Sequence, residues 1–451
     1  MGNILCTILF IVLTGMTFWA ASGRPKKLTS PFDKDVKMRL KGEEYFVILV
    51  FATALFECGM FISTRLLVNE LLCLLVIFRC KSNQAYSVPI ILYIVYFVWI
   101  VIGCFYTYDP VYGVRALIKY IYPLLVVIVC SRVVNSNEVA MKSGVLARKV
   151  GIVAAVIGLT PIIEGGIFWY LTARAINFIS LMIFSLSLFF YEEGNKKHNL
   201  LLAIFFLLPC FILVFRTSIM GSLVALSMFA LFRYKIWAVP FIATIVAAGI
   251  ICVFTIPSLK EKMFFDEDIT FEEVQNGKLD EETINTNGRA VLWDYLEHKF
   301  YEGREWYGSG TGSVQQEMYT NSEFYNGLKV AHSDYVQMRC DNGNVGLVLY
   351  LLAMISVIIH CAYIYTSMGY NKYIKICAIT AGSALAGVLA TLYSDNTVNY
   401  SMCTLSFPMG FYGMMLGLLH AEADKERKEF LERKEMRIKE MIARKIKTEA
   451  H

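Results

Sequence analysis

Residues 200–232 read LLLAIFFLLPCFILVFRTSIMGSLVALSMFALF, an apolar run interrupted only by the polar tripeptide that begins at Arg216. A helix that crosses a hydrocarbon core of roughly 30 Å needs about 20 residues. The run is therefore too long for one crossing, and it is predicted to form two helices joined by a tight turn at Arg216. Because Arg233 and Lys235 follow and basic residues gather on the cytoplasmic side, this turn is expected to face the outside.

The rest of the chain repeats this alternation of apolar runs and short polar loops. Of its 451 residues, 57% are hydrophobic and 18% are charged, and the mean hydropathy is +0.53. At roughly 20 residues per span, about twelve or thirteen spans would account for this composition. The sequence therefore predicts an all-α polytopic membrane protein with one large extracytoplasmic loop.

Four parts follow from the predicted spans. Residues 1–255 are expected to hold about ten transmembrane helices, 256–343 the large extracytoplasmic loop, 344–420 the last three transmembrane helices, and 421–451 a charged cytoplasmic tail helix. Apolar residues recur at helical spacing along the tail. It is interpreted as lying on the anionic inner leaflet, pairing with another helix or standing as a solvated helix.

Two segments of the first part are defined by their charges. Residues 24–41, after a predicted first span at 3–22, are rich in lysine and arginine and are expected to form a cytoplasmic loop. A later span is predicted at about 150–171, preceded by a loop that contains Lys142, Arg148 and Lys149.

Composition also excludes some functions. The net charge of +5 is modest and its basic residues lie in short loops and the tail, so nucleic acid is not an expected partner. Most of the 12 cysteines lie within apolar runs and none forms a CxxC pair, so neither a structural disulfide nor a zinc or redox site is expected.

The chemistry is predicted to lie between residues 287 and 346, where the chain is densest in polar and aromatic residues. Residues 289–300 are predicted to form an amphipathic helix with Asn287 as its N-cap and Arg289 in its first turn. Its expected apolar face consists of Val291, Leu292, Tyr295, Leu296 and Phe300.

A histidine is the most common base at neutral pH. Of the six histidines, only His298 and His332 fall on the predicted outer side. His298 lies on the polar face of the predicted helix, whereas His332 directly precedes a span and could reach the membrane surface. The alternative for His332 is a structural histidine that is hydrogen-bonded within the loop.

An arginine in an apolar run needs a partner or a use, because burying its charge in a membrane is expensive. Arg216 stands at a predicted helix N-terminus, where free N–H groups and a guanidinium both favour a phosphate. The alternative is an ion pair with an intramembrane acid such as Glu57, Glu70 or Glu164. Further positive charge at predicted outer ends comes from Arg115, Lys119 and Arg174, which could equally be interface anchors.

Two local motifs carry little weight. The run from Gly308 to Gly312 reads GSGTG and lacks the Gly-Lys-Ser/Thr ending of a P-loop. Asp266-Glu267-Asp268 resembles a metal-binding DxD motif but lies in an acidic surface run. No metal and no cofactor are therefore expected.

Taken in order, these features resemble the O-antigen ligase and polysaccharide polymerase superfamily of bacterial inner membranes. The motifs that carry the resemblance are Arg216-Thr217-Ser218, Asn287-Gly288-Arg289 followed by Trp293, Gly308 to Gly312, Ala331-His332-Ser333-Asp334-Tyr335, and Asp341-Asn342-Gly343 with Gly346-Leu347. Ser333 departs from the asparagine that often follows the histidine in that family. This departure does not touch the proposed base.

The resemblance implies a metal-independent glycosyltransferase of the multi-span class that uses undecaprenyl-diphosphate-linked glycans at the outer face of the cytoplasmic membrane. By analogy, Arg216 and Arg289 would hold the donor pyrophosphate, and His332 would take the proton from the attacking sugar hydroxyl. Further substrate-binding candidates are Arg115, Arg174, Trp293, Asp334 and Tyr335; aromatic residues near a membrane surface are also common interface anchors.

Chemistry supports this assignment. A lipid diphosphate is an activated leaving group, so catalysis needs neutralisation of the growing phosphate charge and a base on the opposite side of the anomeric carbon. Displacement from that side predicts inversion. The expected reaction is polymerisation of lipid-linked repeat units into an O-antigen, capsule or exopolysaccharide, with the growing polysaccharide as acceptor, membrane lipids around the protein and a chain-length regulator as a further candidate partner.

Three alternatives remain. A ligase would transfer a finished lipid-linked glycan to a lipid or protein acceptor, and it would share the donor and the motifs. A transporter of lipid-linked glycans would be expected to show internal repeats and interrupted midplane helices, which this sequence does not show. A purely structural scaffold is the last.

Overall fold

The computed structural model describes residues 2–56, 61–80, 87–159, 175–212, 216–257, 260, 289–323, 329–400 and 402–449. Nearly all of this part is helical. The N-terminal half contains α1 (Gly2–Ala21), α2 (Gly42–Thr53), α3 (Ile62–Arg79), α4 (Val88–Gly103), α5 (Pro110–Val133), α6 (Asn137–Leu159), η2 (Ala175–Phe178), α8 (Ile179–Phe190) and α9 (Lys196–Ile212). The C-terminal half contains α10 (Arg216–Tyr234), η3 (Lys235–Ala238), α11 (Val239–Thr255), α14 (Arg289–Phe300), α15 (Ser313–Thr320), α16 (Asp334–Thr366), α17 (Lys372–Thr391), η4 (Thr397–Tyr400) and α18 (Ser406–Glu449).

Several of these helices have the length and hydropathy of membrane spans. Five candidates lie in the described part of the chain: Ile4–Ala21, Pro110–Val133, Arg216–Ile251, Asp334–Thr366 and Lys372–Thr391. Shorter apolar helices add to them at Val88–Gly103 and Ala175–Phe190. The predicted class, an all-α polytopic membrane protein, is confirmed. The run at residues 200–232 is divided as predicted into two helices that contact each other, with α10 beginning at Arg216; residues 213–215, just before it, lie outside the described residues.

The core of the bundle is built around α17 and the first part of α18. α17 packs against α10, α16 and α18, and α18 packs against α5. Small residues allow the closest of these contacts. A Cβ added to Gly221 of α10 would lie 3.0 Å from the carbonyl oxygen of Gly387 in α17, and one added to Gly387 would lie 2.4 Å from the carbonyl oxygen of Gly221.

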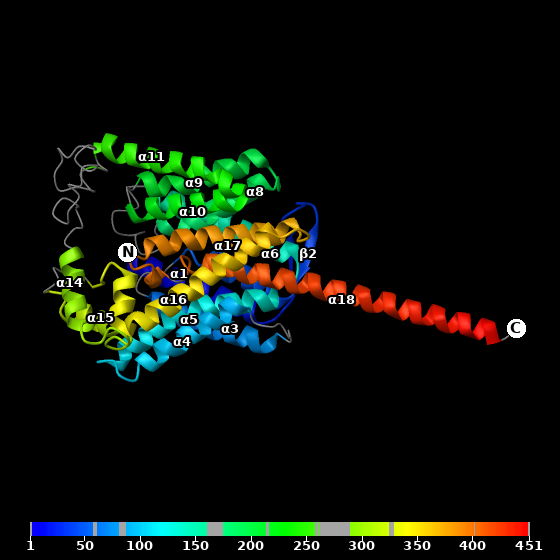
Figure 1. Cartoon of the computed structure of the whole chain (residues 1–451), viewed down its shortest axis with the longest axis horizontal. Coiled ribbons are helices and arrows are strands. Elements are labelled where there is room, and N and C mark those ends of the chain that lie inside the picture. Colours follow the sequence, from blue (N-terminus) through cyan, green and yellow to red (C-terminus); the bar gives the residue numbers. More distant parts are fainter. Residues whose placement is uncertain are drawn as a thin grey trace.

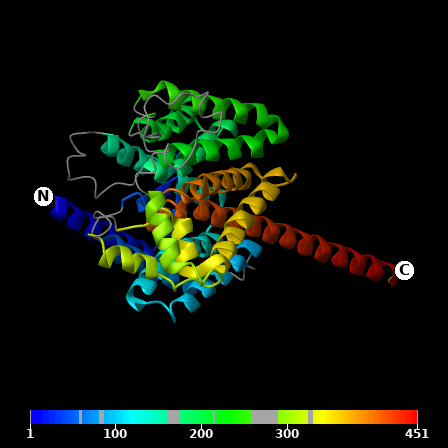
Figure 2. The same cartoon turned by 60° about the vertical axis from the view of Figure 1, so that its left-hand side comes forward.

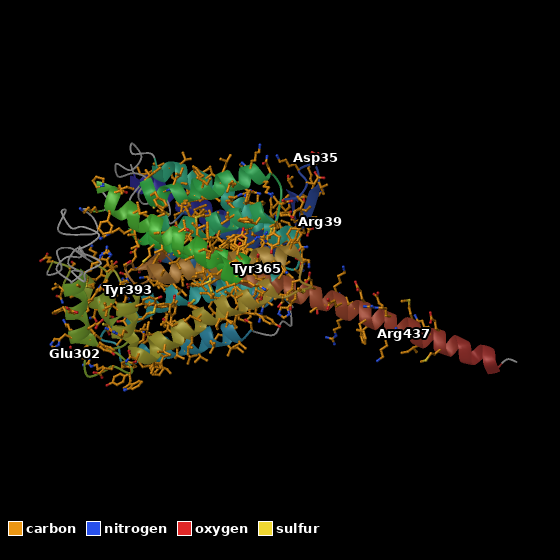
Figure 3. The ribbon with its side chains drawn as sticks, turned by 45° about the horizontal axis from the view of Figure 1, so that its top comes forward. Asp35, Arg39, Glu302, Tyr365, Tyr393 and Arg437 are labelled. Carbon is orange, nitrogen blue, oxygen red and sulfur yellow. The ribbon has the colours of Figure 1, made fainter. Side chains whose placement is uncertain are left out.

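The molecule has two distinct ends (Figure 1). α14 and α15 lie at one end, and the small β-hairpin lies at the other, from which α18 extends away from the bundle. The green helices, which include α9, α10 and α11, lie together along one side of the bundle (Figure 2). Figure 3 labels Tyr393 and Glu302 at the first end and Asp35 and Arg39 at the second.

The structure adds detail to one expectation about the first part of the chain and contradicts another. The basic loop contains a two-stranded antiparallel sheet of β1 (Lys26–Thr29) and β2 (Lys37–Leu40). The helix predicted to start at residue 150 starts at Asn137, so the basic residues assigned to the preceding loop lie within α6. Of these residues, Arg148 is buried, and its guanidinium is satisfied in part because Nη1 donates to Oδ1 of Asn199 at 2.6 Å.

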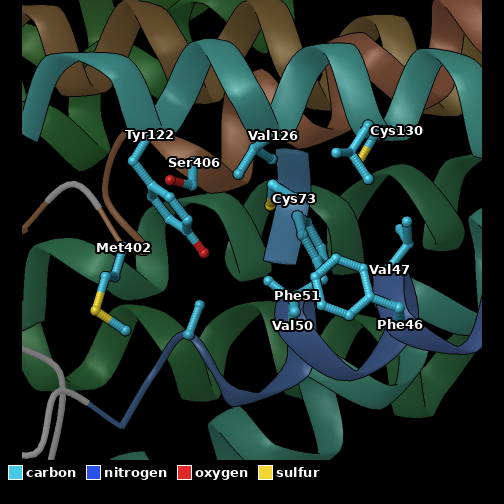
Figure 4. A pocket seen from close by; sticks show the side chains of 12 residues that line it. Phe46, Val47, Val50, Phe51, Cys73, Tyr122, Val126, Cys130, Met402 and Ser406 are labelled. Atoms are coloured by element: carbon cyan, nitrogen blue, oxygen red, sulfur yellow. The ribbon is translucent and has the colours of Figure 1, made fainter. Parts of the chain in front are cut away.

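A cavity lies within the bundle beside α2, α5 and α18 (Figure 4). Its lining is mostly apolar, and Tyr122 and Ser406 contribute the hydroxyl groups: the full set is Phe46, Val47, Val50, Phe51, Ala54, Cys73, Tyr122, Val126, Val129, Cys130, Met402 and Ser406. Most of these residues belong to the main hydrophobic cluster, so the cavity is part of the hydrophobic core.

Candidate active site

α14 forms one wall of the site and begins at Arg289, as the sequence predicted. Leu292, Leu296 and Phe300 are buried in a small cluster with residues of α15 and α16. Val291 is 76% exposed and Tyr295 is 37% exposed, so the prediction was wrong for these two positions. The buried residues are spaced four apart because α14 packs against its neighbours along a single narrow side. The predicted N-cap, Asn287, lies outside the described residues.

Arg289 and Arg216 approach each other from two helix N-termini. Arg289 is half-buried at the start of α14 and donates from Nη1 to the carbonyl oxygen of Ser394 at 2.7 Å. Arg216 is half-buried at the start of α10, close enough for its charge and that of Arg289 to repel each other. Burial lowers the pKa of Arg289, and the nearby carboxylate of Asp395 opposes this effect.

His332 lies directly before α16 in an unusual backbone conformation. Its φ is +55°, in the left-handed region that few residues other than glycine adopt. Hydrogen bonds hold the backbone there: Ala331 accepts from Nε1 of Trp293 at 2.8 Å, and the His332 N–H donates to Oδ1 of Asn396 at 2.5 Å. Such strained residues cluster at functional sites, where surrounding contacts hold them.

The side chains of Asn396 and Asp334 form a buried hydrogen-bonded pair next to the backbone of His332. The amide nitrogen of Asn396 donates to Oδ1 of Asp334 and to Oε1 of Gln337, each at 3.1 Å. The other oxygen of Asp334 accepts from the Thr397 hydroxyl at 3.1 Å and from the Val398 N–H at 3.0 Å. Asp334 is only 2% exposed, so its carboxylate, expected to bind substrate, is occupied by the segment between α17 and α18.

Two aromatic residues predicted to bind sugar face different surroundings. The Trp293 ring packs edge-on against Tyr393, with centroids 5.7 Å apart, and Tyr393 is 61% exposed. The Tyr335 hydroxyl instead donates to the carbonyl oxygen of Leu389 at 2.7 Å and ties α16 to α17. The exposed aromatic surface of the site is therefore that of Trp293 and Tyr393.

α5 brings further positive charge toward the same end. Lys119 donates from Nζ to Oδ1 of Asn399 at 2.6 Å, and its charge interacts with those of Asp334 and Arg115. Arg115 is exposed, with its guanidinium carbon 4.9 Å from the centroid of the Tyr112 ring. Some residues named from the sequence lie outside the described residues: Arg174, Glu57, Glu164 and Asp266-Glu267-Asp268.

The glycine-rich run and the Asp341 motif build the wall beside the site. The carboxylate of Asp341 accepts from the N–H groups of Gly312 and Val314 at 3.1 and 2.9 Å, at the N-terminus of α15. The Thr311 hydroxyl donates to the carbonyl oxygen of Ile100 in α4 at 2.7 Å. These motif residues therefore join α4, α15 and α16.

The sequence identified most of the charged groups but missed the segment that joins them. Residues 392–399 contact Arg289, His332, Asp334 and Lys119. The available signal was the polar run Ser394-Asp395-Asn396-Thr397 between two apolar runs, which was interpreted only as an outer loop. Within the described residues, no group of three or more His, Cys, Asp or Glu side chains is placed to hold a metal ion.

Comparison with known proteins gives one match that covers this site in part. Residues 200–351 match the family model described as O-Antigen ligase. The matched range includes Arg216, Arg289 and His332 but ends before Asn396. A search of curated proteins found no match.

Proposed function

The chain belongs to the O-antigen ligase and polysaccharide polymerase superfamily, and from this premise we propose that it polymerises undecaprenyl-diphosphate-linked oligosaccharide repeat units. The coarser function, a membrane enzyme of the lipid-linked glycan ligase or polymerase type, follows from the family. The proposal adds the reaction, the donor and the place: inverting transfer at the outer face of the bacterial cytoplasmic membrane, with the growing polysaccharide as acceptor.

The observation that carries the proposal is the approach of two arginines at two helix N-termini, with the backbone of His332 bonded to the same segment, residues 392–399, that bonds Arg289. Two half-buried guanidinium groups whose charges repel each other are stabilised by an anion that binds both of them. Both helix N-termini add partial positive charge at the same place. A diphosphate fits this environment, since each arginine can bind phosphate oxygens in a bidentate manner.

His332 supplies the second requirement, a base for the acceptor hydroxyl. In the proposed step, its imidazole takes the proton of an acceptor hydroxyl as that oxygen attacks the anomeric carbon. The bond from that carbon to the diphosphate oxygen breaks, and Arg216 and Arg289 stabilise the negative charge that develops there. The acceptor enters opposite the leaving group, so the configuration is inverted.

The remaining site residues take supporting roles in this proposal. Trp293 and Tyr393 offer aromatic surface for the sugar rings, and Arg115 and Arg174 add positive charge for the donor. Tyr335 is no longer assigned a sugar contact, because its hydroxyl is bonded to α17. Asp334 and Asn396 hold the backbone on which His332 sits.

A ligase is the second candidate, and the description of the matching family favours it. It would use the same donor, arginines and histidine, and it would differ in its acceptor, a separate lipid or protein. Products distinguish the two functions: a polymerase gives a ladder that lengthens with time, and a ligase gives one transfer per acceptor.

The test uses purified protein in nanodiscs, undecaprenyl-diphosphate-linked oligosaccharide and EDTA, with the products separated on a gel. We expect wild type to form a ladder and His332→Asn to slow it by about 10²–10⁴-fold, the usual contribution of a general base. Asparagine is chosen because it tolerates positive φ. His298→Asn is the matched control, since His298 is exposed on α14 and bonds Glu302 at 2.7 Å.

Arginine substitutions complete the test. Arg216→Lys and Arg289→Lys keep the positive charge but lose the planar guanidinium that binds two phosphate oxygens at once. Each variant is therefore expected to transfer more slowly and to form a shorter ladder than wild type. A full ladder from His332→Asn would contradict the enzymatic role of this site. Single transfer to an added acceptor, with no ladder under any condition, would move the assignment to the ligase.

A further inference from the structure

The β-hairpin at the end of the molecule opposite the site has one strongly basic face. In its register Lys27 lies opposite Arg39 and Thr29 lies opposite Lys37. These four side chains are exposed, whereas Leu28 and Met38 are partly buried and Leu40 is buried. The hairpin is therefore anchored by its apolar face and presents its charged face outward (Figure 3).

This arrangement is electrostatically unfavourable by itself. Like charges directly opposite each other destabilise a strand pair, and an isolated two-stranded hairpin is at best marginally stable. Among the described residues, no ion pair joins a carboxylate to Lys27, Lys37 or Arg39. Residues 24–41 contain seven lysines and arginines but only two aspartates, Asp33 and Asp35.

The surroundings of the hairpin place it beside the membrane. β1 begins five residues after α1 ends at Ala21, and α2 starts two residues after Leu40. Trp19, near the end of α1, packs under the ammonium group of Lys26, which lies 3.3 Å from its ring centroid. Tryptophan is enriched at the level of lipid headgroups. The turn of the hairpin also exposes the apolar side chain of Val36 and part of Phe32, whose ring centroid lies 5.1 Å from that of Tyr373.

We propose that the exposed face of this hairpin, formed by Lys27, Lys37 and Arg39, binds the headgroups of anionic phospholipids in the inner leaflet. A row of exposed cations directly beside a span matches a surface of fixed negative charge. Phe32 and Val36 favour the lipid source over a soluble phosphate, since exposed apolar side chains next to basic ones are typical of interfacial segments. The glycan-transfer site plays no part in this inference.

The test compares full-length protein in nanodiscs of phosphatidylcholine alone and of phosphatidylcholine mixed with phosphatidylglycerol. The variant is Lys27→Gln with Arg39→Gln, and the matched control is Lys149→Gln with Lys197→Gln, which removes two exposed charges from α6 and α9. The readouts are Tm and the affinity for phosphatidylglycerol, obtained by counting bound lipids in native mass spectrometry as the fraction of phosphatidylglycerol is varied.

We expect phosphatidylglycerol to raise the Tm of wild type and of the control but not of the hairpin variant. Its affinity for the hairpin variant should fall roughly 30-fold, because each basic residue at an anionic surface contributes about a fivefold factor. In phosphatidylcholine alone the hairpin variant should be at least as stable as wild type, since the repulsion between Lys27 and Arg39 is gone.

Three results would overturn the proposal. Equal loss of lipid binding in both variants would show that overall charge decides the binding. A lower Tm of the hairpin variant in phosphatidylcholine would assign these side chains to folding. Stabilisation of wild type by inorganic phosphate, to the extent seen with phosphatidylglycerol and lost in the hairpin variant, would make the ligand a soluble anion.

Discussion

At the scale of single residues, His332 depends on groups that are distant in the sequence. Its N–H bonds Asn396, and the N–H of the second residue after it, Asp334, donates to the carbonyl oxygen of Leu392 at 2.9 Å. Asn396 in turn donates to Asp334. The buried side-chain amide of Asn396 thus accepts a hydrogen bond from the backbone of His332, the proposed base, and donates one to Asp334 at the start of α16.

The buried pair of Asn396 and Asp334 gives a prediction about how His332 is positioned. Asn396→Asp keeps an acceptor for the His332 N–H but places a second carboxylate against Asp334, and like charges in a buried site repel. We expect the maximal rate of transfer to fall about 10²-fold, the effect of a small misplacement, while the KM for the lipid-linked donor changes little. Initial rates at varied donor concentration measure both quantities.

Two further variants separate positioning from loss of folding. Asp334→Asn with Asn396→Asp restores a donor and acceptor pair and should recover part of the rate. Asn344→Asp is the control: Asn344 lies in α16, as Asp334 does, but its side chain bonds the Tyr301 hydroxyl and not the residues around His332. A double variant that is no faster than Asn396→Asp would contradict the positioning role.

At the scale of elements, a break at Gly343 divides α16 and sets the direction of the chain at the site. Gly343 has φ +67° and ψ −174°, and a Cβ at this position would lie 2.3 Å from the backbone of Trp306. The N–H of Asn344 donates to the carbonyl oxygen of Glu305 at 2.7 Å, which bonds the break to the preceding loop. Residues 334–342, which include Asp334 and Asp341, can therefore run in a different direction from the part of α16 that follows Gly343.

Gly343→Ala tests this break. We expect a loss of roughly 1–3 kcal/mol from the backbone conformation alone, and more from the contact with Trp306. Gly303→Ala is the control: Gly303 also has a positive φ, +76°, but a Cβ there would meet nothing within 4 Å. Thermal unfolding measures both, and equal losses of stability would show that close packing at Gly343 has no importance.

The elements also show what sequence could and could not predict. α14 was predicted with its observed bounds because its polar flanks and apolar residues are local signals. The hairpin was missed because strands of four residues that read KKLT and KMRL carry little strand signal. Asn396 was missed because its partner His332 lies 64 residues away, and only tertiary packing brings the two together.

At the scale of the whole molecule, one close helix contact joins the two parts that supply the arginines. α10 carries Arg216 at its start, and it crosses α17 where Gly221 meets Gly387. α17 leads at its end into residues 392–399, which bond Arg289. The distance between the two arginines therefore depends on how closely α10 and α17 approach, as small residues permit in membrane helices.

Gly221→Val should separate these helices. A Cβ at Gly221 would already lie 2.5 Å from Cγ2 of Thr391, so we expect overpacking to cost about 1–3 kcal/mol and transfer activity to fall. Gly249→Val in α11 is the control, since the nearest atom to its added Cβ is 3.7 Å away. Thermal unfolding and the gel assay provide the two measurements; normal activity in Gly221→Val would remove the link between this contact and the site.

The length of α18 has a mechanical consequence. Its 44 residues form one unbroken helix, about 66 Å long at 1.5 Å per residue, and only its first third is buried in the bundle. Because the rest of the helix lies outside the bundle, any change in its direction is magnified at its end. A tilt of the helix by about 5° at the buried end moves a tip roughly 40 Å away by about 3.5 Å. A probe attached to the tip would therefore magnify small rearrangements among α5, α17 and the start of α18, next to the segment that holds His332.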